Sequence, residues 1–247
     1  MGEGVWYLKQ CHLFDRLSEG EAGQLNRRAL TRTYKRGAVI YSPHQPGETV
    51  LVLASGRVKI KNITQDGRET ILAFIEEGEL FGELALLDGQ VRREYAEAVD
   101  ASQVLLIPRG DIVTLMENRP DIALSVTKLI GLRRLRIETR LRNLLFLTSR
   151  DRMVHILLEL AETHGNRIGN RVELRIPLSH QDVASLIGVT RETATLTLGQ
   201  MQAVGIVEVS RRRIVISDVR RLNAEANGSS EPPAPSRPPP VSPNSPR

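Results

Sequence analysis

The sequence predicts an α+β fold with three parts: an N-terminal antiparallel β-roll, a long central helix, and a small C-terminal domain of short helices and hairpins. Short apolar runs separated by turn residues occupy the segment from Thr33 to Pro108, which is typical of rolled antiparallel sheets. A helical pattern without internal proline then begins at Pro120. Two short helical segments and a basic hairpin follow. The predicted boundaries are 1–116 for the roll, 117–148 for the central helix, 149–221 for the C-terminal domain and 222–247 for a tail.

The strands of the roll are predicted from runs of β-branched and aliphatic residues, several of which alternate with polar residues. These runs lie at 38–41, 49–56, 57–62, 70–75 and 103–108. Turn residues that supply positive φ angles or tight reversals stand between them, at Gly37, Pro46 and Gly47, Gly56, Asp66 and Gly67, and Gly78. We therefore expect the chain to reverse direction at these positions.

The central helix carries an apolar seam at a spacing close to 3.5 residues, which is typical of a helix that pairs with a second helix. The seam residues, which we expect to form a dimer interface, are Val126, Ile130, Ile137, Leu141 and Leu144. Arg134 interrupts the seam and is expected to pair with Glu138 one turn later. The apolar residues expected to pack on the sheet are Leu129, Leu132 and Leu135. The alternative is a helix buried in the core of a monomer.

A pair of short helices joined by a tight turn is predicted in the C-terminal domain. Ser179 is suited to cap a helix that begins at His180. Ala184 is small at a point where two helices must nearly touch, and Gly188 gives the turn its backbone freedom. Thr190 is suited to cap the second helix. This order of features predicts a helix-turn-helix, and the alternative is an ordinary αα-hairpin.

The second helix of this pair has an apolar and a polar face. Helical spacing turns three residues toward the core, namely Ala194, Leu198 and Met201. An arginine on the opposite face can bind guanine, a glutamate can accept from cytosine, and a leucine or threonine methyl can contact thymine. We therefore expect a DNA-contacting surface made of Arg191, Glu192, Thr195 and Leu196, with Ser179, His180 and Thr190 at the helix starts.

A basic hairpin is predicted after the helix pair, with three arginines at its tip: Arg211, Arg212 and Arg213. Such a wing can contact DNA phosphates and add salt-dependent affinity without reading sequence. The alternative is a solvated turn.

The composition favours some function classes over others. A formal charge of +5 and a pI of 9.7 suit a polyanionic partner. Cys11 is the single cysteine, so an intrachain disulfide or a zinc ribbon cannot form, and we expect no metal site. The five histidines show no metal-ligand spacing and no catalytic constellation is present, which disfavours an enzyme. Without an apolar span or a signal-peptide pattern, we expect a cytoplasmic protein.

The proline-rich tail is expected to be disordered, with a basic arm or docking peptide as the alternative.

Two segments in order, LFGELALLDGQ and LSHQDVASLIGVTRETATLTLGQM, resemble the cyclic-AMP receptor/fumarate-nitrate regulator (CRP/FNR) family of transcription regulators. The likeness covers roughly residues 10 to 220. It implies a cyclic-nucleotide-binding-like sensor, dimerisation through the central helix, and a winged helix-turn-helix that binds palindromic DNA. The start of the recognition helix at Arg191, Glu192 and Thr193 matches the family closely. Leu196 stands where many members carry a second arginine, which implies an altered operator.

The resemblance also implies a ligand site in the roll. Backbone amides around Gly82 to Leu84 would cradle a phosphate, Glu83 would accept from a ribose hydroxyl, and Arg92 would bind the phosphate. Arg93 replaces a small hydroxyl residue in this motif. Glu94 also replaces a small residue there, and the positions that contact adenine hold Ile137 and Glu138.

Three states of the sensor follow from these residues: cyclic AMP bound, another small anion bound with Arg93 as a second cation, or no ligand and constitutive DNA binding. Glu94 opposes an anion unless it pairs with a neighbouring arginine. The expected partners are double-stranded DNA, a second copy of the chain, and RNA polymerase if the protein is an activator. The alternative function is that of a regulatory ligand-binding module in a signalling complex.

Overall fold

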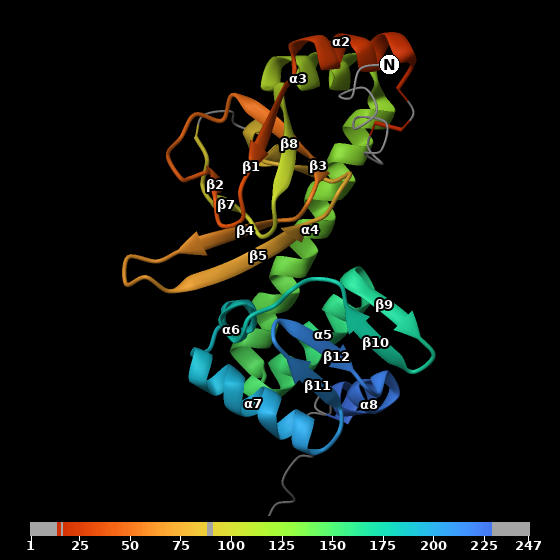
Figure 1. Ribbon diagram of the computed structural model, residues 1–247. Helices are drawn as coiled ribbons and strands as arrows, with labels where there is room; N and C mark the ends of the chain where they lie inside the picture. Colours follow the sequence, from red (N-terminus) through yellow and green to blue (C-terminus); the bar gives the residue numbers. More distant parts are fainter. Residues whose placement is uncertain (1–13, 16, 88–90, 229–247) are drawn as a thin grey trace, which may run out of the picture. The chain divides into compact units, whose positions relative to one another are not determined.

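The computed structural model describes residues 14–15, 17–87 and 91–228 (Figure 1). Cys11 and most of the expected proline-rich tail lie outside the described residues. The described residues form two compact units. One contains those up to Phe146 together with Gln181–Arg191, and the other contains Leu147–His180 together with those from Glu192 to Gly228.

The N-terminal unit contains two four-stranded antiparallel sheets. The first has the order β1-β8-β3-β6 and the second β2-β7-β4-β5. The strands of the first are β1 (Leu30–Tyr34), β3 (Thr49–Ser55), β6 (Leu80–Phe81) and β8 (Ser102–Pro108). Those of the second are β2 (Val39–Tyr41), β4 (Val58–Ile63), β5 (Glu69–Ile75) and β7 (Tyr95–Ala98). This arrangement confirms the predicted β-roll.

Strand β3 lies between two hydrophobic cores, and this position explains why its sequence is apolar without interruption. Val50 and Val52 belong to one core, together with residues of three helices. Leu51 and Leu53 belong to the other, between the two sheets. Because successive side chains of a strand point to opposite faces, a strand covered on both sides must be apolar at every position.

Three helices pack against the first of these sheets: α2 (Glu19–Arg28), α3 (Arg109–Asn118) and α4 (Pro120–Phe146). Helix α4 is the predicted long helix, and its Ile122 and Val126 are buried. Arg140 of α4 donates to the carbonyl oxygens of Ile71 and Leu72 at 3.2 and 2.9 Å. Leu72 is the extra residue where the β4–β5 register shifts, so the helix satisfies carbonyls at an irregularity of the sheet.

The C-terminal residues form α5 (Ser149–His164), a sheet of order β11-β12-β10-β9 and α8 (Val219–Gly228). The strands are β9 (Gly165–Ile168), β10 (Arg171–Leu174), β11 (Val207–Ser210) and β12 (Arg213–Ile216). Thr148 caps α5 in a capping box with Asp151. Helix α8 was not predicted: it continues past the expected start of the tail at 222, because Val219, Leu222 and Ala226 are buried.

Candidate functional site

The predicted helix-turn-helix is present as α6 (His180–Ile187) and α7 (Arg191–Ala203). Each helix begins one residue after its expected cap, Ser179 or Thr190. Gly188 has φ +66°, and the Val189 amide donates to the Ala184 carbonyl at 3.1 Å. A left-handed glycine that ends a helix in this way turns the chain sharply. Ala184 is completely buried, as its small size predicts.

Helix α7 has the two faces that its spacing predicts. Ala194, Leu198 and Met201 are buried. The side chains on the other face are exposed, namely those of Arg191, Glu192, Thr195 and Leu196. The Thr195 hydroxyl lies 2.8 Å from Nδ1 of the half-buried His180. The helix therefore presents a basic, an acidic and an apolar group near its N-terminal end.

The wing is a two-residue turn between β11 and β12, in which Ser210 pairs with Arg213. Arg211 and Arg212 form the turn, and Arg212 has φ +60°. The Arg212 carbonyl accepts from the Leu178 amide at 3.1 Å, which ties the wing to the segment before α6. Arg213 lies on β12 and makes a bidentate ion pair with Glu173 on β10, at 2.5 and 2.8 Å. The tip therefore consists of two arginines, and the third is engaged in the sheet.

The seam of helix α4 is partly covered within the protomer. Val126 is 1% exposed, so it packs in the core of its own unit and is not available to a partner. Ile137, Leu141 and Leu144 remain exposed, and Ile130 is half-buried. Leu132 and Leu135 are exposed as well, contrary to the expectation that they pack on the sheet. Arg134 pairs with Glu138 at 2.7 Å as predicted.

The sensor cassette is built around Gly82, which has φ +68° and precedes the 3-10 turn η1 (Glu83–Leu86). The Arg92 side chain enters this turn and is buried. Its Nη1 donates to the Gly82 carbonyl at 2.9 Å, and its Nη2 donates to the carbonyl and hydroxyl oxygens of Thr49. A Cβ on residue 82 would lie 2.6 Å from the Arg92 Nη1. Glycine thus allows the guanidinium to approach the turn.

Glu83 is engaged by the long helix. Its carboxylate lies 2.6 Å from Nη1 of Arg133 on α4. The same guanidinium donates through Nη2 to the Leu80 carbonyl at 2.7 Å. Sequence reasoning missed Arg133, because nothing local distinguishes it from the other arginines of α4.

Tyr41 and Glu94 complete the cassette. The Arg92 guanidinium lies over the Tyr41 ring, 4.4 Å from its centroid, in cation–π geometry. The Tyr41 hydroxyl donates to Glu94 at 3.1 Å. Burial raises the pKa of Glu94 and of Tyr41, and burial lowers the pKa of Arg92. Arg93 is exposed, so its side chain lies outside the buried part of the cassette, and the expected role of the backbone amides from Gly82 to Leu84 stays a prediction.

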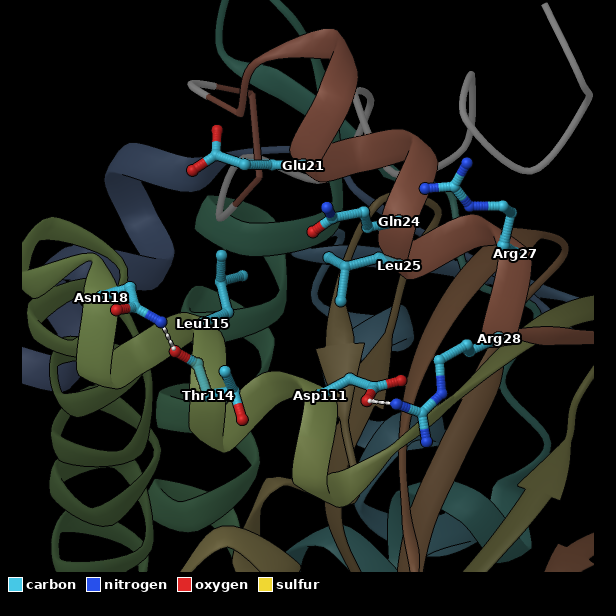
Figure 2. Close-up of a pocket in the computed structure, with 9 residues that line it drawn as sticks. All are labelled: Glu21, Gln24, Leu25, Arg27, Arg28, Asp111, Thr114, Leu115 and Asn118. Carbon is cyan, nitrogen blue, oxygen red and sulfur yellow. Dashed lines mark hydrogen bonds and ion pairs between the residues drawn. The ribbon is translucent and has the colours of Figure 1, made fainter.

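A groove of about 430 Å³ lies between α2 and α3, and none of the cassette residues lines it (Figure 2). Arg28 reaches Asp111 across it at 2.8 Å, and Asn118 donates to the Thr114 carbonyl at 2.8 Å.

Among the described residues, no group of three or more His, Cys, Asp or Glu is placed to hold a metal ion. Within the same part of the chain, no helix has the length and apolar character needed to cross a membrane.

Comparison with known proteins matches both units. The cyclic nucleotide-binding domain model matches residues 31–119, and the Crp-like helix-turn-helix domain model matches residues 151–225. A Mycobacterium tuberculosis protein named CRP-like cAMP-activated global transcriptional regulator is 25% identical over 219 residues, covering 89% of this chain and 98% of its own length. The global nitrogen regulator of Synechococcus elongatus is 30% identical over 185 residues, covering 74% of this chain and 83% of its own length.

The solved structures give the same result. FixK2 from Bradyrhizobium japonicum has a TM-score of 0.70 and 26% identity, covering 79% of this chain and 96% of its own. The protein belongs to the CRP/FNR family of DNA-binding transcription regulators.

Proposed function

We propose that the protein acts as a homodimer that binds two-fold symmetric DNA sites, with the N-terminal half of α7 in the major groove. The observation that carries this proposal is the exposed face of α7, where Arg191, Glu192 and Leu196 stand opposite a fully buried face. Arg191 would donate to guanine, Glu192 would accept from cytosine, and Leu196 would contact a thymine methyl. Thr195 would face the major groove as well, where its methyl group can contact thymine. Ser179, His180 and Thr190 would position the helix pair on the DNA backbone.

The wing adds affinity in this proposal. Arg211 and Arg212 at its turn would contact phosphates, which contributes a salt-dependent and sequence-independent term. Arg213 contributes less, because Glu173 holds its guanidinium. The overall positive charge of the chain acts in the same direction.

The dimer interface is proposed to lie on helix α4. Ile137, Leu141 and Leu144 expose between 43% and 55% of their surface in one protomer, at a spacing that a second helix can cover. The α7 helices of the two protomers would then bind two half-sites that are one turn of DNA apart. We further propose that the protein acts in the cytoplasm and contacts RNA polymerase at its target promoters.

The test is selection from random double-stranded DNA by the full chain, followed by fluorescence anisotropy on the selected site. The proposal predicts a two-fold symmetric sequence bound by two protomers, with affinity that falls steeply as salt rises. Leu141→Glu is expected to give monomers by sedimentation and weaker DNA binding. The matched control is Leu30→Glu, because Leu30 is a similarly exposed leucine in the sensor. A selected sequence without symmetry, or dimers of the Leu141→Glu variant, would contradict the proposal.

A further inference from the structure

Two guanidinium groups and two carboxylates share the sensor cassette. Glu83, Arg92 and Glu94 are 7%, 5% and 6% exposed, and the Arg133 side chain is 16% exposed. Their formal charges cancel when all four groups are ionised. Buried charges are tolerated when they are balanced and hydrogen-bonded. A bound phosphate or dicarboxylate would add negative charge to a cluster that is already neutral.

Arg92 makes three hydrogen bonds within the protein. It donates to the carbonyl of Gly82 and to both oxygens of Thr49, and its face covers the Tyr41 ring. A ligand anion would have to replace these partners with bonds of its own. The gain from a phosphate on Arg92 is therefore reduced by the contacts that would be lost.

Glu94 and Arg92 are both buried in the segment that precedes β7, and residue 93 between them is exposed. Tyr41 connects the pair, since its ring lies under the Arg92 guanidinium and its hydroxyl donates to the Glu94 carboxylate. Tyr41 therefore holds both the Glu94 carboxyl group and the Arg92 guanidinium inside the cassette.

Glu83 is occupied in a similar way. Arg133 binds its carboxylate, and the same arginine is fixed by the Leu80 carbonyl. A sugar hydroxyl that donated to Glu83 would compete with a full positive charge. Both groups that would bind a nucleotide are thus committed to partners within the chain.

We propose that Glu94 is the built-in counter-anion of Arg92, and that this carboxylate closes the cassette to cyclic nucleotides and other small anions. The protein then binds DNA without a ligand in the cassette. This inference rests on the proposed DNA-binding function, because it names the regulation of the same molecule. A single side chain, that of Glu94, would then decide whether the cassette accepts an anion, because it supplies the negative charge that a ligand would otherwise bring.

The experiment is isothermal titration calorimetry of the full chain with cyclic AMP, and separately with 2-oxoglutarate. The wild type is expected to show no saturable binding up to about 1 mM. Glu94→Gln keeps the hydrogen-bond acceptor for Tyr41 and removes the charge, and it is expected to bind cyclic AMP at least about tenfold more tightly than the wild type. Glu94→Ala is expected to gain binding as well. The gain should disappear when Arg92→Gln is added.

The matched control is Glu77→Gln, which changes the net charge equally at an exposed position and should gain no binding. Saturable binding of either anion by the wild type overturns the inference, and this measurement does not depend on whether a variant folds. Folded Glu94→Gln and Glu94→Ala proteins that bind no better than the wild type overturn it too. Fluorescence anisotropy with DNA on the same samples distinguishes failure of the proposed function from failure of this inference. A wild type that does not bind DNA refutes the proposed function. A wild type that binds DNA, together with Glu94 variants that bind cyclic AMP no better than the wild type, refutes this inference alone.

Discussion

Removing Arg133 is expected to destabilise the sensor unit substantially. The Arg133 and Glu83 side chains are 16% and 9% exposed and 2.6 Å apart. Removing one member of a buried ion pair leaves an uncompensated charge and costs about 3–5 kcal/mol. Because Arg133 keeps some contact with solvent, the lower end of this range applies. The lost hydrogen bond to the Leu80 carbonyl adds about 1 kcal/mol. Arg133→Met should therefore lower the free energy of unfolding by about 3–4 kcal/mol.

Urea denaturation of the full chain, followed by circular dichroism, measures this change. The matched control is Arg136→Met, which removes an exposed arginine of the same helix and should change the free energy of unfolding by less than about 0.5 kcal/mol. The double variant Arg133→Met/Glu83→Gln should recover at least about 2 kcal/mol relative to the sum of the single variants. Additive losses, or an Arg133→Met protein as stable as the control, would refute the reasoning.

Three further substitutions test other parts of the account. Gly82→Ala forces a left-handed backbone on alanine and places a Cβ 2.6 Å from Arg92, so thermal denaturation should show a loss of about 2–3 kcal/mol; an unchanged midpoint would be inconsistent with the cassette geometry. Ala184→Leu overfills a completely buried position and should cost about 1–3 kcal/mol and abolish DNA binding in a gel-shift assay, whereas unchanged binding would argue against a close approach there. Hydrogen bonds from Ser18, and then from Arg119, lower the pKa of Glu21 to about 2 from 4.5. The ionised Glu21 carboxylate contributes its full stability above pH 4.5, and this contribution is lost as the pH falls toward 2. Between these pH values the denaturation midpoint of Glu21→Gln should therefore vary less with pH than that of the wild type. The same pH dependence in both proteins would show that the contacts of Glu21 contribute nothing.

Periodicity predicted the elements whose burial is one-sided or complete. Helix α7 has a clean apolar face, and strand β3 is apolar throughout because both of its faces are covered. Strand β1 was missed because Leu30–Tyr34 is mostly exposed and carries no apolar run. It is a strand because it pairs along its whole length with β8, and such pairing leaves no local signal.

The cassette shows a similar limit. The motif identified Gly82, Glu83 and Arg92, since their types and order are local. Their partners Tyr41 and Arg133 come from distant parts of the chain, and only the folded roll and the long helix bring them together. For this reason the sequence left three sensor states open, whereas the structure adds the side chains that Arg92, Glu83 and Glu94 contact within the chain.

Base-pair-resolved DNA binding is the most direct test of the central claim that α7 reads sequence. The measurement compares Arg191→Ala with Arg211→Ala on the selected site and on every single-base variant of one half-site. Arg191→Ala is expected to lose about 1–3 kcal/mol and to relax the preference at one base pair, whereas Arg211→Ala should weaken all sequences equally and reduce the salt dependence. Uniform weakening by Arg191→Ala, with every base preference intact, would contradict the account.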